Sequence, residues 1–494
     1  MTTQPSAATG RPAPPVDNTA AGHPAAGYPR RWLAAIVMIT GALMDMIDVT
    51  IVNVALPTIR HDLHASATQL EWVVSGYMLA FAAVLIIAGN LGDLLGRKRV
   101  FLFGVAAFGL ASLGAGLAGS GAELITARFV QGAAAAAMAP QVLATFRAIF
   151  TGSERGKAFG IYGAMLGFAS AVGLVLGGVL TDANLFGWSW RAVFFVNIPV
   201  SACALIAGLR LVPETRDPAA RRPDVPGAIV LASSLVAIVY PLLEGRQLGW
   251  PAWVWLVLAA GVAGLVGLGV VEARRGGRRS SPLLRAGLFR VPAFAAGLGV
   301  QLAFSAGLQG FFLSFALWLQ AGELFSPLKA GLTLVAFSVG SFIGAPAAVP
   351  LAQRHGRSVL AAGGVLMVAG IAGVALAARH VGVHGSPWPI TPGLVVAGAG
   401  LALLVIPLVN VVLAAVSVEV AGGASGLFST AQQLGGALGV ALLGTVFFGY
   451  LSGHPFQAAL VHVAPYAMGA FALCAVLSML LPRTAVSEES LTGS

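Results

Sequence analysis

Apolar runs of about 20 residues recur from one end of this chain to the other, separated by short connectors. A helix of that length crosses a hydrocarbon core of about 30 Å. Only 9% of the 494 residues are charged and 57% are hydrophobic, whereas a soluble domain is about 25% charged. Such a chain cannot cover a water-facing surface. We therefore predict an integral membrane protein, and an all-α one, because helices satisfy their own backbone groups in lipid.

Fourteen runs are long enough to be transmembrane helices. We place them at 33–56, 70–91, 100–119, 123–146, 158–180, 191–211, 226–243, 252–271, 293–318, 328–350, 358–377, 392–416, 426–450 and 463–481.

Lys and Arg are distributed unevenly between the connectors. With the amino terminus inside, 22 of the 28 lie on the cytoplasmic side, five lie on the opposite side, and Arg128 falls within a span. Positive charge is enriched in cytoplasmic loops, and one missing span would mix the two sets. We predict a multi-pass protein of the cytoplasmic (inner) membrane with both termini in the cytoplasm. The net charge of +10 forms no single basic face, which argues against nucleic acid as a partner.

A weak internal repeat divides the chain. Residues 91–97 (LGDLLGR) and 351–357 (LAQRHGR) share Leu, Gly and Arg at identical spacing, each after a corresponding pair of spans. Repeats of this kind are typical of transporters built from two related halves. We predict a tail at 1–30, a six-helix bundle at 31–212, two inserted helices with a basic loop at 213–290, a second six-helix bundle at 291–482, and a tail at 483–494.

Two carboxylates, Asp45 and Asp48, are the deeply placed acids in the predicted spans, and both lie on one face of the first. A charge at the centre of a span costs about 2.5–3.5 kcal/mol and marks a functional site by default. Arg128 is the embedded cation, at a depth about 6 Å from that of Asp48. We predict that the two pair, directly or through water. For the two acids, the alternative is a hydrogen-bonded pair that only fixes helix packing.

Other chemistries lack support in the sequence. There is no cluster of His, Cys or carboxylates with metal spacing, no phosphate-binding loop and no nucleophile elbow. Cys203 and Cys474 lie inside apolar runs and are interpreted as small core residues. We predict no metal, no cofactor and no enzymatic activity, and a monomer whose partners are the lipid bilayer, protons and a small-molecule substrate.

Several motifs resemble a known family. Residues 89–99 (GNLGDLLGRKR) are similar to the signature loop of the major facilitator superfamily. Residues 46–57, 128–132, 190–199 and 426–439 resemble motifs of its fourteen-helix drug:proton antiporters, in the same order along the chain. The resemblance implies the major facilitator fold, with two six-helix bundles plus two inserted helices around a central cavity that opens to each side in turn.

The resemblance also implies roles for individual residues. Asp48 and Arg128, with Asp45, would handle protons, and a substrate cavity would include Asn53, Gln131 and Gln432. A gating loop would comprise Gly89, Asp93, Gly96 and Arg97. For the loop charges, ordinary membrane anchoring is the alternative.

The fifth span departs from the family pattern. Gly173, Gly177 and Gly178 provide the small residues that let helices pack closely. Leu174 stands where the family motif usually has proline, so the bend that proline favours is not assured.

These features predict proton-coupled efflux of small hydrophobic or amphiphilic compounds such as drugs. A dedicated exporter of one endogenous metabolite, such as an antibiotic, siderophore or lipid precursor, is the alternative within transporters. A membrane sensor or assembly factor that kept the fold and lost transport is the alternative from another class.

Overall fold

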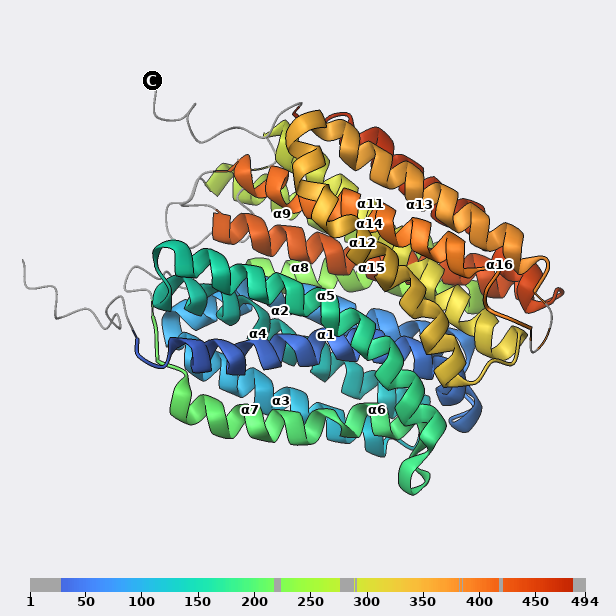
Figure 1. The fold of residues 1–494 in the computed structure, drawn as a ribbon, viewed down its shortest axis with the longest axis horizontal. Helices are drawn as coiled ribbons and strands as arrows, with labels where there is room; N and C mark the ends of the chain where they lie inside the picture. The colour runs from blue at the N-terminus through green and yellow to red at the C-terminus, as the bar shows by residue number, and fades with distance from the viewer. Residues whose placement is uncertain are drawn as a thin grey trace, which may run out of the picture.

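The computed structural model describes residues 28–216, 224–275, 288, 291–381, 383, 385–416 and 421–482. These residues form long helices that run roughly side by side (Figure 1). The helices are α1 (Arg31–Asp62), α2 (Ala67–Leu95), α3 (Arg97–Leu117), α4 (Gly121–Ile149), α5 (Gly152–Ala183), α6 (Ala192–Phe195), α7 (Asn197–Leu211), α8 (Val225–Leu248), α9 (Ala252–Arg275), α11 (Pro292–Leu317), α12 (Pro327–His355), α13 (Arg357–Ala378), α14 (Thr391–Ala414), α15 (Ala421–Leu451) and α16 (Phe456–Ser478).

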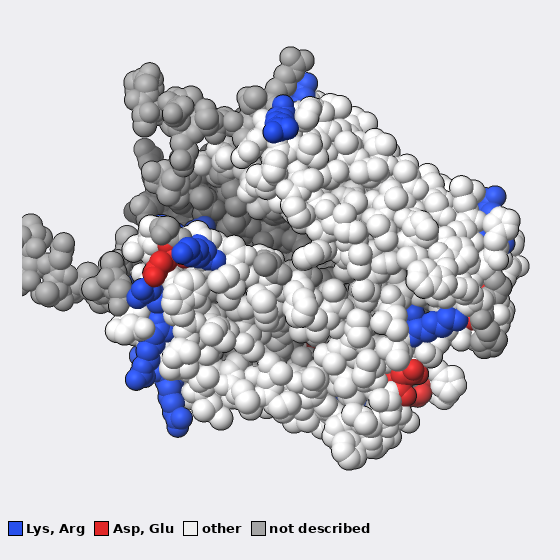
Figure 2. All heavy atoms as spheres, viewed as in Figure 1, with Lys and Arg blue, Asp and Glu red and all other residues white. Residues whose placement is uncertain are grey.

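Most of the described helices have the length and apolarity that crossing a membrane requires. Thirteen helical segments of the described residues meet both conditions, with α6 and α7 counted in one segment, Ser189–Leu211. The 32-residue α5 packs against α1 in the place predicted for the fifth of fourteen spans. Lys, Arg, Asp and Glu gather toward the two ends, and the visible belt between them carries almost none (Figure 2). The prediction of an all-α multi-pass membrane protein is confirmed.

Helix starts follow local side-chain chemistry. Ser66 accepts a hydrogen bond from the Gln69 amide, and the Gln69 side chain accepts one from the Ser66 amide, so α2 begins with a capping box. The Ser120 and Ser326 hydroxyl oxygens cap α4 and α12 by accepting hydrogen bonds from the Glu123 and Lys329 amides. Each cap satisfies a backbone N–H that the helix itself leaves without a partner.

The first helix is longer than predicted. We expected it to end near Pro57, but α1 continues through this proline to Asp62. Proline removes one backbone donor from a helix but leaves the chain free to continue.

The spans gather into two groups of helices. In the first, α1 packs on α5 and α7, and α4 packs on α2 and α3. In the second, α14 packs on α12 and α13, while α16 packs on α11 and α13. We call these groups the N half (α1–α7) and the C half (α11–α16). In Figure 1 the N half lies below the C half. The predicted tails at 1–30 and 483–494 lie outside the described residues, except for 28–30.

The repeat predicted from the connectors has a counterpart in backbone geometry. Gly96 separates α2 from α3 with φ +111°, and Gly356 separates α12 from α13 with φ +59°. Positive φ is costly for residues with a Cβ, which explains why both repeats keep glycine at this position.

The two halves meet along two seams. One seam joins α2 to α15 and the other joins α5 to α12. Helix α8 packs against both α2 and α15, so it borders the first seam, and α9 packs on α8. Trp72 Nε1 donates to Glu244 Oε1 at 2.8 Å, and the Thr445 hydroxyl donates to the Leu242 carbonyl at 3.2 Å. The two inserted helices, α8 and α9, are therefore attached to both halves through the contacts of α8.

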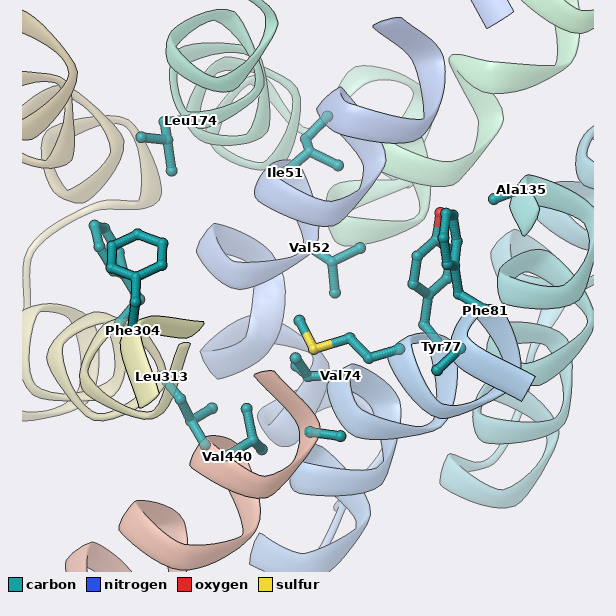
Figure 3. Close-up of a cluster of buried hydrophobic side chains, with 14 of the residues drawn as sticks. Ile51, Val52, Val74, Tyr77, Phe81, Ala135, Leu174, Phe304, Leu313 and Val440 are labelled. Atoms are coloured by element: carbon teal, nitrogen blue, oxygen red, sulfur yellow. The ribbon is translucent and has the colours of Figure 1, made fainter. Parts of the chain in front are cut away.

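Contacts between the halves lie toward one end of the bundle. We call the end of the bundle at which α1 begins and α16 ends the terminal end, and the opposite end the far end (Figure 1). Gln320 Nε2 donates to the Val54 carbonyl at 2.8 Å, and Ser75 Oγ donates to the Ala437 carbonyl at 3.4 Å. Buried apolar side chains from α1, α2, α5, α11 and α15 gather where the halves face each other (Figure 3).

The hydrogen bonds described between the halves all lie toward the far end. They join Ser75 to Ala437, Gln309 to Met78 and Gln320 to Val54. Near the terminal end, a Cβ added at Gly160 or Gly163 of α5, or at Gly426 of α15, would meet no atom within 4 Å. The far end is therefore the end at which the described halves are joined.

Closure of the α5–α12 seam depends on glycine. A Cβ added at Gly178 would lie 2.7 Å from the Leu328 Cα, and one at Gly331 would overlap the Leu174 carbonyl oxygen. We expect Gly178→Leu to disfavour this closed seam by about 1–3 kcal/mol, because backbone atoms cannot yield. Alkylation of a cysteine introduced for the buried Leu174 should then accelerate about tenfold or more.

Gly163→Leu is the matched control for this prediction. It lies on the same helix in open space and should leave the alkylation rate unchanged. Equal rates in the two leucine variants would show that the α5–α12 seam does not set the closed far end.

Candidate functional site

A buried ion pair lies inside the N half. The Arg128 guanidinium on α4 donates from Nη1 to Asp48 Oδ2 on α1, and both side chains are almost fully buried, at 2% and 0% exposure. Arg128 Nε also donates to the Val73 carbonyl of α2 at 3.1 Å. The pair predicted from helix depths, either direct or through water, is present as a direct contact, and Arg128 connects three helices of one half.

Amide side chains complete the surroundings of Asp48. Asp48 Oδ1 accepts from Gln131 Nε2 at 3.1 Å and from Asn197 Nδ2 at 2.9 Å. Gln131 Oε1 accepts from Arg128 Nη1 at 2.9 Å, and Gln131 Nε2 also donates to Ser112 Oγ at 2.8 Å. A buried charge is tolerated when it is paired and hydrogen-bonded, and this network meets both conditions.

Asp45 lies one turn away from Asp48 and is more exposed. Its side chain is partly exposed, unlike that of Asp48. The Tyr77 hydroxyl on α2 donates to Asp45 Oδ1. The Arg128 guanidinium carbon lies 4.2 Å from the centre of the Tyr77 ring, a cation–π distance. The two carboxylates and one guanidinium therefore form one connected group, with Asp48 sealed and Asp45 reachable.

The predicted gating loop is attached to the N half. Arg97 donates from Nε and Nη2 to Asp93 Oδ1 at 3.0 and 2.8 Å, and from Nη1 to the Ala144 carbonyl at 3.3 Å. A Cβ at Gly96 would overlap Glu214 Oε1. Gly89 lies on α2 near Pro140, with 3.8 Å between the added Cβ and the proline Cβ. These contacts of the four residues stay within the N half and the segment that follows it; their gating role stays a prediction.

The glycines predicted in the fifth span face two directions. Added Cβ atoms at Gly173 and Gly177 would meet α1, where the first would overlap Thr50 Oγ1 and the second would lie 2.9 Å from the Ile51 carbonyl oxygen. Gly178 faces the other half. Helix α5 therefore packs closely on the helix that carries the acids and on α12 at once. Leu174, at the position of the family proline, is buried against Gly331.

The residues predicted for a substrate cavity lie in different places. Asn53 is buried and donates to the Val49 carbonyl of its own helix at 3.0 Å. Gln131 belongs to the Asp48 network, and Gln432 is exposed on α15. Contact of these residues with substrate stays a prediction. Within the described residues, no group of three or more His, Cys, Asp or Glu side chains could hold a metal ion.

The sequence interpretation missed several members of the site. Tyr77 and Ser112 lie in runs of apolar residues that hid them, and Asn197 was quoted only within a family motif. It also did not single out Glu71 of α2, which lies near the start of its helix and is fully buried within the protein. Its place near the start of an apolar run concealed this, since burial there depends on α15, which is distant in sequence.

The comparisons with known proteins agree with this architecture. The family model described as Major Facilitator Superfamily matches residues 38–320. The chain is 39% identical to a protein named probable actinorhodin transporter from Streptomyces coelicolor, over 91% of this chain and 78% of that protein. It is 37% identical to a puromycin resistance protein of Streptomyces alboniger, over 94% of each chain. A multidrug efflux pump of Mycolicibacterium smegmatis is 34% identical, over 85% of this chain and 81% of that pump.

Solved structures share the fold at low identity. A crystal structure of a peptide transporter in complex with sulfate superposes with a TM-score of 0.65 at 16% identity, over 91% of this chain and 95% of that one. Together with the helical halves and the motifs along the chain, these matches place the protein. It is a membrane transporter of small molecules, and it belongs to the major facilitator superfamily, within the group that resembles drug:proton antiporters.

Proposed function

We propose that this protein exports small hydrophobic or amphiphilic compounds, such as drugs, in exchange for protons. The connected group of Asp45, Tyr77, Arg128 and Asp48 carries the proposal, because buried ionisable side chains in a transmembrane helix mark proton relays and ion pathways. The names of the relatives as resistance proteins, export proteins and efflux pumps support the direction and the class of substrate.

The two acids have different parts in the proposed exchange. Asp45 is partly exposed and is the group through which protons enter and leave. Asp48 is the fixed partner of Arg128 and keeps this guanidinium buried beside Tyr77. Protonation of Asp45 removes one negative charge from the group. This change alters the attraction between α1, α2 and α4, and so biases the closure of the halves.

We also propose the setting of this exchange. The protein lies in the cytoplasmic membrane as a monomer with both termini in the cytoplasm, so the terminal end faces inward and the far end outward. The positive charges counted in the connectors support this orientation. A proton moving inward releases about 2.3 kcal/mol of free energy per 100 mV of membrane potential. This free energy can sustain a tens-fold concentration gradient of the exported compound. In this proposal the exported compound crosses the membrane without being changed chemically.

Purified protein in liposomes provides the test. With an imposed pH gradient, we expect lipophilic cationic dyes and antibiotics from a panel to be transported in the direction opposite to the flow of protons. Collapse of the gradient by a protonophore should stop this transport, because no other energy source is present. Transport that persists at the same rate after the collapse would contradict proton coupling.

A dedicated exporter of one endogenous metabolite is the second candidate. Relatives named actinorhodin transporter and tetracenomycin C resistance and export protein favour it, since each of those names refers to a single compound. The same panel separates the two. Movement of one compound class alone supports the dedicated exporter, and movement of several unrelated classes supports drug efflux.

A further inference from the structure

Glu71 is a buried acid that the Asp45–Arg128 group does not include. It lies in the second turn of α2, near the far end, and its side chain is 0% exposed. Neither carboxyl oxygen has a hydrogen-bond partner among the described residues. Buried carboxylates normally accept hydrogen bonds, so this side chain requires an explanation.

The carboxyl group is pressed against the backbone of the other half. A Cβ added at Gly444 of α15 would lie 2.6 Å from Glu71 Oε1 and 3.0 Å from its Cδ. One turn further along α2, Ser75 donates a hydrogen bond to the Ala437 carbonyl of α15. Two turns further, the Met78 sulfur lies 2.7 Å from the position of a Cβ added at Gly436. Glu71 is therefore covered by α15 for as long as the α2–α15 seam is closed.

The charged groups around Glu71 come from the helices beside α2. Helix α8 provides Arg246 and Glu244; Arg246 lies over the Phe448 ring at 5.3 Å, and Glu244 accepts from Trp72. Of the other helices that contact α2, α4 carries Arg128 and Glu123 and α1 carries Asp45 and Asp48; no interaction of these four side chains with Glu71 is described, and the Arg128 guanidinium is held by Asp48. Helix α15 has no charged side chain anywhere along its length.

These surroundings suit the neutral acid. A carboxylate buried without a donor costs several kcal/mol, whereas the protonated acid avoids most of that cost. Opening of the far end would withdraw α15 from Glu71 and admit water, which would remove the penalty on the charged form. Closure of the seam and binding of a proton are then linked.

We propose that Glu71 is a proton-operated latch on the α2–α15 seam. It binds a proton from the outer solution before the far end closes, and it returns that proton to the same side when the far end opens. Because the proton enters and leaves on one side, the latch adds nothing to the number of protons transported. It makes closure of the far end respond to external pH. This proposal rests on the proposed function, in which the two ends of the bundle open in turn.

Distances between spin labels at the far end test the latch. Labels at cysteines replacing His61 and Gly453, both exposed at the far end, report the separation of the halves in nanodiscs once Cys203 and Cys474 are replaced by serine. In the parent protein, the ratio of closed to open forms should fall with rising pH, by up to about tenfold per pH unit for one linked proton. Glu71→Gln mimics the neutral acid and should stay closed, with a flatter pH response.

Two further variants sharpen the result. Glu123→Gln, an exposed far-end acid that accepts from the Gly119 amide, is the matched control and should keep the parent response. Gly444→Ala places a methyl group against the Glu71 carboxyl and should shift the ratio toward the open form at every pH, provided that the seam closes as described.

The parent pH response in Glu71→Gln, or a more open far end in that variant, would overturn the latch. Neither result would affect the proposed function, which is measured as gradient-driven transport in liposomes. Conversely, failure of gradient-driven transport by the parent protein would end the proposed function, and the distances would still report whether Glu71 controls the seam.

Discussion

Replacement of Asp48 by asparagine is expected to reduce gradient-driven efflux to the background of empty liposomes. Asparagine has the same shape but no charge, so Arg128 loses its counter-ion inside the N half. Its NH₂ group would also face the NH₂ groups of Gln131 or Asn197, which now donate to the carboxylate. Loss of one partner of a buried ion pair costs about 3–5 kcal/mol.

Exchange measurements separate loss of coupling from loss of folding. Substrate-for-substrate exchange needs the two open states but no net proton movement. We therefore expect Asp48→Asn to retain exchange while gradient-driven transport is lost. Asp182→Asn, an exposed acid at the end of α5, is the matched control and should keep both. Gradient-driven transport at the parent rate in Asp48→Asn, at equal protein amounts, would remove Asp48 from the mechanism.

Replacement of Arg128 by glutamine should have the second large effect. This change leaves the Asp48 carboxylate buried without its cation and removes the donor to the Val73 carbonyl, so α1, α2 and α4 lose their common partner. We expect loss of gradient-driven transport and a destabilisation of about 3–5 kcal/mol, measured as a lower melting temperature in detergent. Arg379→Gln, at an exposed position at the far end, should match the parent in both measurements.

The double variant Asp48→Asn/Arg128→Gln tests whether the two residues act as a pair. Removal of both charges leaves no uncompensated charge, so its melting temperature should exceed that of either single variant. Transport should stay absent, because the double variant still lacks the Asp48–Arg128 pair that the proposed exchange couples to Asp45 through Tyr77. Strictly additive losses of stability would show that Asp48 and Arg128 do not interact in the folded protein.

The structure adds a conformational state to these expectations. Contacts such as Gln320 with Val54 close the far end, while Gly160 and Gly426 face open space toward the terminal end. Under the orientation proposed above, the far end that these contacts close is the outer one. The described hydrogen bonds of the Asp93–Arg97 pair stay inside the N half, and the gating role of this pair stays a prediction.

Much of the fold could be predicted because the bilayer imposes it locally. A run of about 20 apolar residues must become a helix in lipid, whatever its neighbours are. The depth of Asp48 and Arg128 follows from counting residues along straight helices at about 1.5 Å each, which is why their pairing could be expected.

Side chains that depend on packing could not be predicted in this way. Tyr77 binds Asp45, and Asn197 binds Asp48, across helices whose relative rotation no single-helix pattern determines. Gly173 and Gly178 both signal close packing in the sequence, yet one meets α1 and the other meets α12 of the C half.

The sequence by itself determined the spans, the positive-charge asymmetry and the acids and cation of the first and fourth spans. Lipid solvation acts on each segment separately, so these features can be recognised one segment at a time. Only the tertiary structure decided which end is closed and that Glu71 is buried under α15. Both depend on contacts between residues hundreds of positions apart, which arise only when the two halves meet.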